Sequence, residues 1–276
     1  MVVSMANCYL GVWRHALRLR SWFLTLINFL MATSPTSQSL SPIHCTTVGR
    51  GLDVLAAGAL NPTPCPVYGA DLLYLFYGRP AYKPAAGIGA SGILDLAPIC
   101  LVLDPTVMAA AVRAVPFDSG GFKRYGALVG PGLDRPDFEL SGDPSLPLRL
   151  VKAFYQTNRN YYDQNPTTRE ADLPVSRRTA RALARLFADS SIRNVDDRCG
   201  TIELQFSTAI PLANALQAIV APAAMLDDAE VLQALALCPG AVPIPYKTYG
   251  RFDPVSFAHT IYEKVDCFLE AIGRFA

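Results

Sequence analysis

Short apolar runs that end at glycine or proline constrain the fold of this chain most. Residues 71–78 (DLLYLFYG) form a continuous apolar and aromatic run, and Pro80 follows it closely. Residues 99–103 (ICLVL) form a second run, which stops at Asp104 and the proline after it. Runs of this length between turn residues are typical of buried strands. The sequence therefore predicts at least two buried strands in its first half.

Three helices are predicted around these strands. Residues 49–58 place Leu52, Leu55 and Ala56 on one face and end at Gly58. A second helix is predicted from Ser176 to about residue 189, with apolar residues on one side. Its other side carries Arg177, Arg178, Arg181 and Arg185. Such an arginine face is typically solvated, and contact with phosphates is the alternative. A third helix follows the cap at Asp253 and runs to the C-terminus.

Composition sets the class of protein. The chain has 276 residues, of which 51% are apolar and 17% charged, so it can bury a core, and a disordered or fibrous chain is excluded. With 24 basic and 23 acidic side chains its net charge is +1, so a nucleic acid or an anionic membrane would have to be held by a local patch. The seven cysteines form no C-x-x-C pair, which favours reduced thiols in a cytoplasmic protein over a zinc site or disulfides.

The N-terminal segment suggests a leader. Residues 22–31 are apolar, stand behind Arg14, Arg18 and Arg20, and precede a small, polar stretch. This is the layout of a signal peptide, which would make the protein secreted, but the run is too short to span a bilayer comfortably. The alternatives are a true start at Met31, a loosely attached helix or a membrane anchor. We expect residues 1–41 to be leader and linker and residues 42–276 to form one domain.

A late strand carries the most informative polar residues. In residues 201–206 (TIELQF) the apolar side chains alternate with Glu203 and Gln205, which therefore share the opposite face. An ordinary half-exposed strand would have the same pattern. Two earlier segments make this one more informative: His44 and Thr46 at the end of a predicted strand, and residues 72–83 (LLYLFYGRPAYK), which are rich in tyrosine. Taken singly, a histidine or a tyrosine cluster is more often packed in the core.

The order of these segments resembles the ADP-ribosyltransferase superfamily. The resemblance is to its His-Tyr-Glu branch, which includes diphtheria-type toxins, poly(ADP-ribose) polymerases and DNA-targeting bacterial ADP-ribosyltransferases. These proteins begin with a strand ending in His-x-Thr or His-x-Ser and continue with a helix reading roughly I-L-x-x-G-L, a pattern that HCTTVGRGLDVLAAGAL follows here. The resemblance covers about residues 42–220. It implies a single α+β domain with a split, mainly antiparallel sheet that encloses a cleft, and helices packed outside.

The resemblance also implies an activity and its residues. The enzyme would cleave the nicotinamide–ribose bond of NAD, its substrate, without a metal, and transfer ADP-ribose to a macromolecular acceptor. Glu203 would accept a hydrogen bond from the ribose 2′-hydroxyl and stabilise the oxocarbenium-like centre. His44 would bind a ribose hydroxyl, and Thr46 would help to hold the nicotinamide end.

The remaining ligand contacts are assigned by the same resemblance. Tyr77 or Tyr82 would stack on the nicotinamide ring, and both are preferred to Tyr74 because they flank the turn after the strand. Arg79 would bind the pyrophosphate, since its planar fork suits two phosphates.

The acceptor is left open by the sequence. Branches that modify arginine carry an acid two residues before the catalytic glutamate, where this chain has Thr201. An arginine acceptor is therefore disfavoured. The acceptor could be a nucleic-acid base, another side chain or water. If it is water, the protein is an NAD glycohydrolase. A bacterial toxin or defence effector of this kind would have an inhibitor or antitoxin protein as a partner.

Two alternatives come from other classes. One is a thiol hydrolase in which Cys45 or Cys199 is served by His44 or His259. The other is a non-catalytic binding protein. A separate turn, residues 115–121 (VPFDSGG), is predicted to be a plain turn, although Asp118 and Ser119 could reach a ligand.

Overall fold

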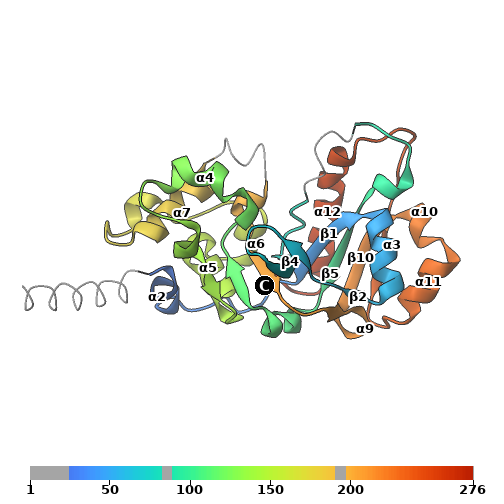
Figure 1. Ribbon diagram of the computed structural model, residues 1–276, viewed down its shortest axis with the longest axis horizontal. Coiled ribbons are helices and arrows are strands. Elements are labelled where there is room, and N and C mark those ends of the chain that lie inside the picture. Colours follow the sequence, from blue (N-terminus) through green and yellow to red (C-terminus); the bar gives the residue numbers. More distant parts are fainter. Residues whose placement is uncertain (1–24, 83–88, 190–196, 276) are drawn as a thin grey trace, which may run out of the picture.

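Figure 1 shows the computed structural model, which describes residues 25–82, 89–189 and 197–275. The basic part of the predicted leader and Cys8 lie outside the described residues, as does Lys83 at the end of the tyrosine-rich segment.

A mainly antiparallel sheet forms the centre of the fold. In the described residues it has nine strands, in the order β11-β10-β5-β1-β4-β8-β6-β7, with β3 paired to the end of β4. Only β10 and β11 run parallel. The strands are β1 (Pro42–Thr47), β3 (Thr63–Cys65), β4 (Ala70–Tyr77), β5 (Pro98–Leu103), β6 (Arg113–Val115), β7 (Leu140–Ser141), β8 (Glu203–Phe206), β10 (Leu216–Pro222) and β11 (Val242–Tyr246). The predicted α+β class is confirmed, and so are the two buried strands, as β4 and β5.

The sheet splits between β1 and β4. Strand β1 pairs with β5 over five residues, but it pairs with β4 only through Pro42↔Tyr77 and Ile43↔Phe76. Beyond Ile43 the two strands part, while β4 continues to pair with β8. The split divides the sheet into a half that contains β5 and β10 and a half that contains β8 and β6.

Helices cover both halves of the sheet (Figure 1). The half that contains β5 and β10 is flanked by α3, α10 and α11, and α12 packs against these two strands. The other half is flanked by α4, α5, α6 and α7. A small second sheet pairs β2 (Ala59–Leu60) with β9 (Ile210–Pro211). The helices are α2 (Leu26–Met31), α3 (Val48–Ala57), α4 (Phe122–Val129), α5 (Ser145–Tyr155), α6 (Asn158–Tyr162), α7 (Arg178–Ala188), α9 (Leu212–Ala215), α10 (Ala223–Leu226), α11 (Ala229–Ala236) and α12 (Ala258–Ala271).

Part of the expected linker belongs to the folded unit. Helix α2 packs against α5, and Leu26, Leu30 and Leu40 are buried in the core. Arg149 of α5 also donates to the Thr33 carbonyl at 2.5 Å. The packed unit therefore includes residues that the sequence analysis placed before the domain boundary at Pro42. No helix in the described ranges combines the length and the apolar character needed to cross a bilayer.

The three predicted helices are present, with local differences. Helix α3 ends at Gly58, whose φ is 62°, but Leu52 is exposed rather than packed with Leu55. Helix α7 starts two residues after Ser176. Its arginines do not form a merely solvated face: Arg181 and Arg185 both donate to Glu170 Oε1, at 2.8 and 2.5 Å. These arginines hold the neighbouring loop, because a guanidinium can serve several acceptors at once.

The turn that ends β4 requires glycine. Gly78 has a φ of 69°, and a Cβ atom there would overlap the Leu40 side chain, coming within 2.8 Å of its Cβ. Gly69 has a similar φ of 64° but open space around it. We expect Gly78→Ala to destabilise the protein by about 2–4 kcal/mol, because it adds overpacking to backbone strain. Gly69→Ala should cost only about 1 kcal/mol of strain. Urea unfolding of both variants measures the difference, and equal losses would contradict it.

Candidate active site

Glu203 is a buried carboxylate on an interior strand of the sheet. Strand β8 places it between β4 and β6, in register with Phe76 on one side and Val115 on the other. Only 2% of its surface is exposed. Gln205, on the same face, is completely buried. The alternation predicted for this strand is thus present, and the face that carries Glu203 and Gln205 is buried, unlike that of an ordinary half-exposed strand.

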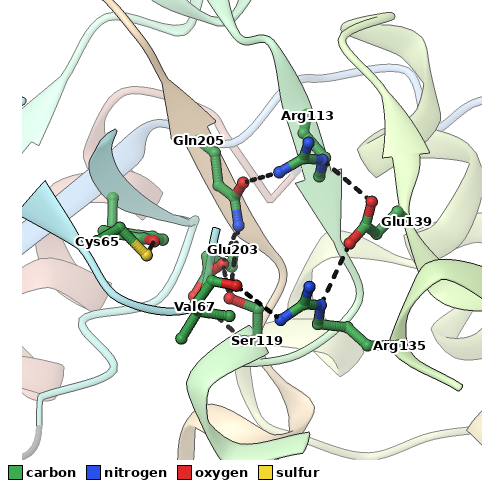
Figure 2. Close-up of polar contacts among 9 residues, drawn as sticks. Cys65, Val67, Arg113, Ser119, Arg135, Glu139, Glu203 and Gln205 are labelled. Carbon is green, nitrogen blue, oxygen red and sulfur yellow. Dashed lines mark hydrogen bonds and ion pairs between the residues drawn. The ribbon is translucent and has the colours of Figure 1, made fainter. Parts of the chain in front are cut away.

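Three hydrogen bonds hold the Glu203 carboxylate (Figure 2). The Ser119 hydroxyl donates to Oε1 at 2.7 Å, and the Ser119 backbone N–H donates to Oε2 at 3.3 Å. The Gln205 amide donates to Oε1 at 2.7 Å. Ser119 begins the 3₁₀ turn η3 (Ser119–Gly121), which Asp118 stabilises by accepting from the Gly120 N–H. The predicted plain turn is therefore the element that covers the carboxylate.

Burial changes the acidity of this carboxyl group. Removal from water raises the pKa of Glu203 to about 7. The bonds from Gln205 and Ser119 favour the ionised form and oppose this rise, whereas the negative charge of Asp118 adds to it. Arg198 pairs with Asp118 at 3.0 Å. Glu203 consequently changes its charge near neutral pH, as acids and bases at functional sites often do.

His44 lies where β1 and β4 part. Its Nδ1 is 3.0 Å from the Tyr74 carbonyl oxygen. Burial lowers the pKa of His44, with the Tyr74 bond acting against this and the Arg50 charge acting with it. The ring is therefore neutral at pH 7, with its proton on Nδ1, because a carbonyl can only accept, and Nε2 is left as an acceptor. In the sheet order, β1, which carries His44, is two strands from β8, which carries Glu203, and the pairing of β1 with β4 ends one residue before His44.

Tyr74 contributes to the carboxylate side of the site. Its register partner is Gln205, so it shares the face of β4 that looks toward Glu203. Its hydroxyl donates to the Cys65 sulfur at 2.6 Å. Burial raises the pKa of Tyr74, and the negative charge of Glu203 raises it further. Of the three tyrosines weighed in the sequence, the one disfavoured there is therefore a neighbour of Glu203.

Tyr77 and Arg79 are part of the core. Tyr77 is completely buried, and its hydroxyl accepts from the Leu40 N–H at 3.0 Å. The Arg79 guanidinium donates to the Tyr162 carbonyl at 2.9 Å and to the Thr201 hydroxyl at 2.7 Å. These bonds hold the end of β4 to α6 and to the start of β8. The structure thus does not bring Tyr77 to Glu203, because successive residues of a strand point to opposite faces.

Tyr82 is the remaining tyrosine near β1. Burial raises its pKa to about 12, and Cys45, the residue after His44, adds to the shift. Its hydroxyl oxygen is buried and has no hydrogen-bond partner among the described residues. Thr46, the other predicted ligand residue of β1, is half-buried and in register with Ile99. A buried hydroxyl without a partner is uncommon in folded proteins and marks Tyr82 as a candidate ligand contact.

Two neighbours of the site were missed in the sequence. The Arg113 guanidinium donates to the Gln205 side-chain oxygen at 2.7 Å, and it also lies 4.2 Å from the centre of the Tyr68 ring. Neither residue belongs to a recognisable motif. Arg113 reaches the site because the short strand β6 pairs with β8, and that pairing has no signal in a single sequence.

The described residues show no metal site. No three His, Cys, Asp or Glu side chains of residues 25–82, 89–189 and 197–275 gather closely enough to bind an ion. A hollow of about 400 Å³ lies between α3 and α11, where Leu55, Met225 and Val231 line it. No candidate site residue lines this hollow, so the geometry around Glu203 identifies the candidate site.

Comparisons with known proteins give matches to structures alone. No family model matches the sequence, and no curated protein matches it. Among solved structures, the chain is similar to DarT of Thermus sp. 2.9 in complex with carba-NAD⁺, at 14% identity and a TM-score of 0.38 over 77% of this chain and 98% of that one. The complex of that DarT with ADP-ribosylated single-stranded DNA matches at 12% identity and a TM-score of 0.40, over 78% and 97%.

The raised pKa of Glu203 predicts how stability depends on pH. The carboxyl ionises near pH 4.5 when unfolded and near 7 when folded, so the folded state holds the proton more tightly and loses stability as pH rises through this window. We expect the wild type to lose on the order of 2–3 kcal/mol more than Glu203→Gln between pH 4.5 and 8.

Urea unfolding at several pH values measures this difference. Glu263→Gln, which removes an exposed carboxylate of α12, is the matched control and should follow the wild type. Parallel curves for the wild type and Glu203→Gln would show that Glu203 has an ordinary pKa.

Proposed function

We propose that this chain is an ADP-ribosyltransferase that cleaves the nicotinamide–ribose bond of NAD and passes ADP-ribose to a macromolecular acceptor. The observation that carries the proposal is the Glu203 carboxylate, buried in the sheet and held by Ser119 and Gln205. Its strand β8 is two strands from β1, which carries His44 just after the end of its pairing with β4.

The chemistry requires a fixed negative charge. Loss of nicotinamide leaves positive charge on the ribose, and a carboxylate held in place stabilises that charge without having to reorganise. Glu203 Oε1 already accepts two short hydrogen bonds, whereas among the described residues Oε2 accepts only the long bond from Ser119. In the proposed complex Oε2 accepts the ribose 2′-hydroxyl, which orients the sugar as the bond to nicotinamide breaks.

The other residues would position the dinucleotide. His44 Nε2 can accept a second ribose hydroxyl because its Nδ1 is committed to Tyr74. Thr46, on the same strand, would help to hold the nicotinamide end. Tyr82 would stack on the nicotinamide ring and bring to the ligand its hydroxyl, which has no partner among the described residues. Tyr77 and Arg79 are left out of this set because their side chains are already committed to the core.

The thiol-hydrolase alternative has less support. The Cys45 thiol contacts Cys100, while the nearest histidine in the chain, His44, is bonded to the Tyr74 carbonyl. Cys199 is completely buried. A thiol nucleophile needs a base within hydrogen-bond reach, and His44 is turned to a different partner.

Release of nicotinamide tests the proposal. We expect the wild type to release nicotinamide from NAD, and Glu203→Gln to lose about 10²–10³-fold or more in kcat, because the charge that stabilises the transition state is gone. Glu263→Gln should keep the wild-type rate. Labelled NAD with single-stranded DNA, RNA and protein as acceptors then identifies the product. Label on any of them supports the transferase, and release without transfer would make the protein an NAD glycohydrolase. A wild type that leaves NAD intact would refute both.

The rate should also depend on pH through Glu203. Only the ionised carboxylate stabilises the transition state, and its pKa in the free protein is about 7. We therefore expect kcat/KM for NAD to rise with pH and to level off above an apparent pKa of about 7, since this parameter reports the free enzyme. Initial rates from pH 5 to 9 measure the profile. If kcat/KM does not change between pH 5 and 9, the negative charge that stabilises the transition state belongs to a group with an ordinary carboxyl pKa.

A further inference from the structure

Gln205 connects the candidate catalytic carboxylate to an arginine on the next strand (Figure 2). Its amide nitrogen donates to Glu203 Oε1 at 2.7 Å, and its amide oxygen accepts from Arg113 Nη1 at 2.7 Å. Gln205 is completely buried, so water does not compete for either end. The amide nitrogen therefore bonds to an anion, Glu203, and the amide oxygen bonds to a cation, Arg113.

The partners determine which way the amide points. An arginine side chain has donors and no acceptor, and an ionised carboxylate has acceptors and no donor. The oxygen of Gln205 must consequently face Arg113 and the nitrogen must face Glu203. The reverse orientation would place an amide oxygen against the carboxylate, and a buried repulsion of this kind is costly.

Arg113 is itself held from two sides. Its Nε pairs with Glu139 Oε2 at 3.3 Å, and its guanidinium lies 4.2 Å from the centre of the Tyr68 ring. Arg135 has the same two partners, Glu139 at 3.3 Å and the Tyr68 ring at 4.3 Å. Of the two arginines, only Arg113 is bonded to Gln205. The two arginines thus share Glu139 and the Tyr68 ring as partners; Arg113 also bonds to Gln205, and Arg135 also donates to the Val67 carbonyl at 3.4 Å.

We propose that Arg113 is a positioning residue, which holds the oxygen of Gln205 so that the amide fixes Glu203 Oε1 and leaves Oε2 for the ligand. This assignment rests on the proposed role of Glu203. Without Arg113 the amide can turn over, and Glu203 then loses a donor and the restraint on its orientation. The energetic cost of burying the ionised carboxylate would then be less well offset, so the pKa, which burial already raises, would rise further.

The first experiment follows the protonation of Glu203 in the absence of NAD. The ¹³C resonance of its carboxyl group is assigned by its loss in Glu203→Gln and is then titrated. We expect Arg113→Met to raise the pKa by about one unit, a change typical of one lost charge-assisted bond. Arg113→Lys, which keeps the charge, should restore part of the shift. Arg135→Met is the matched control and should leave the pKa close to that of the wild type.

A double-mutant cycle separates positioning from the charge of Arg113. If Arg113 acts through the amide, Gln205→Leu should raise the pKa of Glu203 similarly, and adding Arg113→Met should change it little further, since coupled sites are not additive. Additive shifts, or equal shifts from Arg113→Met and Arg135→Met, would overturn the proposal in favour of a general charge effect. The Gln205→Leu titration also decides the matter should Arg113→Met fail to fold.

Kinetics link the bond to the reaction. We expect Arg113→Met to lower kcat at pH 7.5 about tenfold, with little change in KM for NAD. The acid limb of the kcat/KM profile, which reports the free enzyme, should be displaced in step with the pKa. A fall in kcat with an unmoved limb would indicate a merely structural role. Should the wild type fail to consume NAD while the cycle gives the expected shifts, the proposed function fails and the positioning of Glu203 by Arg113 stands.

Discussion

The burial of one carboxylate determines the arrangement of the candidate site. Glu203 is almost completely removed from water, which is costly for an ion unless hydrogen-bond donors replace the solvent. Ser119 supplies two of these donors and Gln205 the third. Three elements thus meet around a single charged group: the 3₁₀ turn that begins at Ser119, the short strand that carries Arg113, and the interior strand β8. Its pKa of about 7 shows that the donors offset only part of the cost.

The split in the sheet frees the part of β1 that carries His44. An uninterrupted pairing of β1 with β4 would leave the edges of both strands hydrogen-bonded to each other and unavailable to a ligand. Here the pairing stops after Ile43, and the His44 ring bonds to the Tyr74 carbonyl beyond it. The split therefore leaves the part of β1 that carries His44 unpaired with β4.

Two residues predicted as ligand contacts make hydrogen bonds that hold the fold together. Tyr77 and Arg79 resemble ligand residues in the sequence because tyrosine and arginine suit a nicotinamide ring and a pyrophosphate. In the structure they join β4 to the segment before β1, to α6 and to the start of β8. A tyrosine or an arginine satisfies buried backbone groups as well as it binds a ligand, so the residue type alone does not separate the two roles.

The sequence by itself determined the elements whose signals are local. The apolar runs of β4 and β5, the helix that Gly58 ends and the alternation that puts Glu203 and Gln205 on one face follow from strand and helix periodicity and from the backbone freedom of glycine. Only the tertiary structure decided that this face is covered, that Arg113 lies beside Gln205, and that Tyr77 points away from Glu203. Those facts depend on the pairing of β8 with β4 and β6, which joins segments about 90 to 130 residues apart, and contacts at such separations have no periodicity in the sequence.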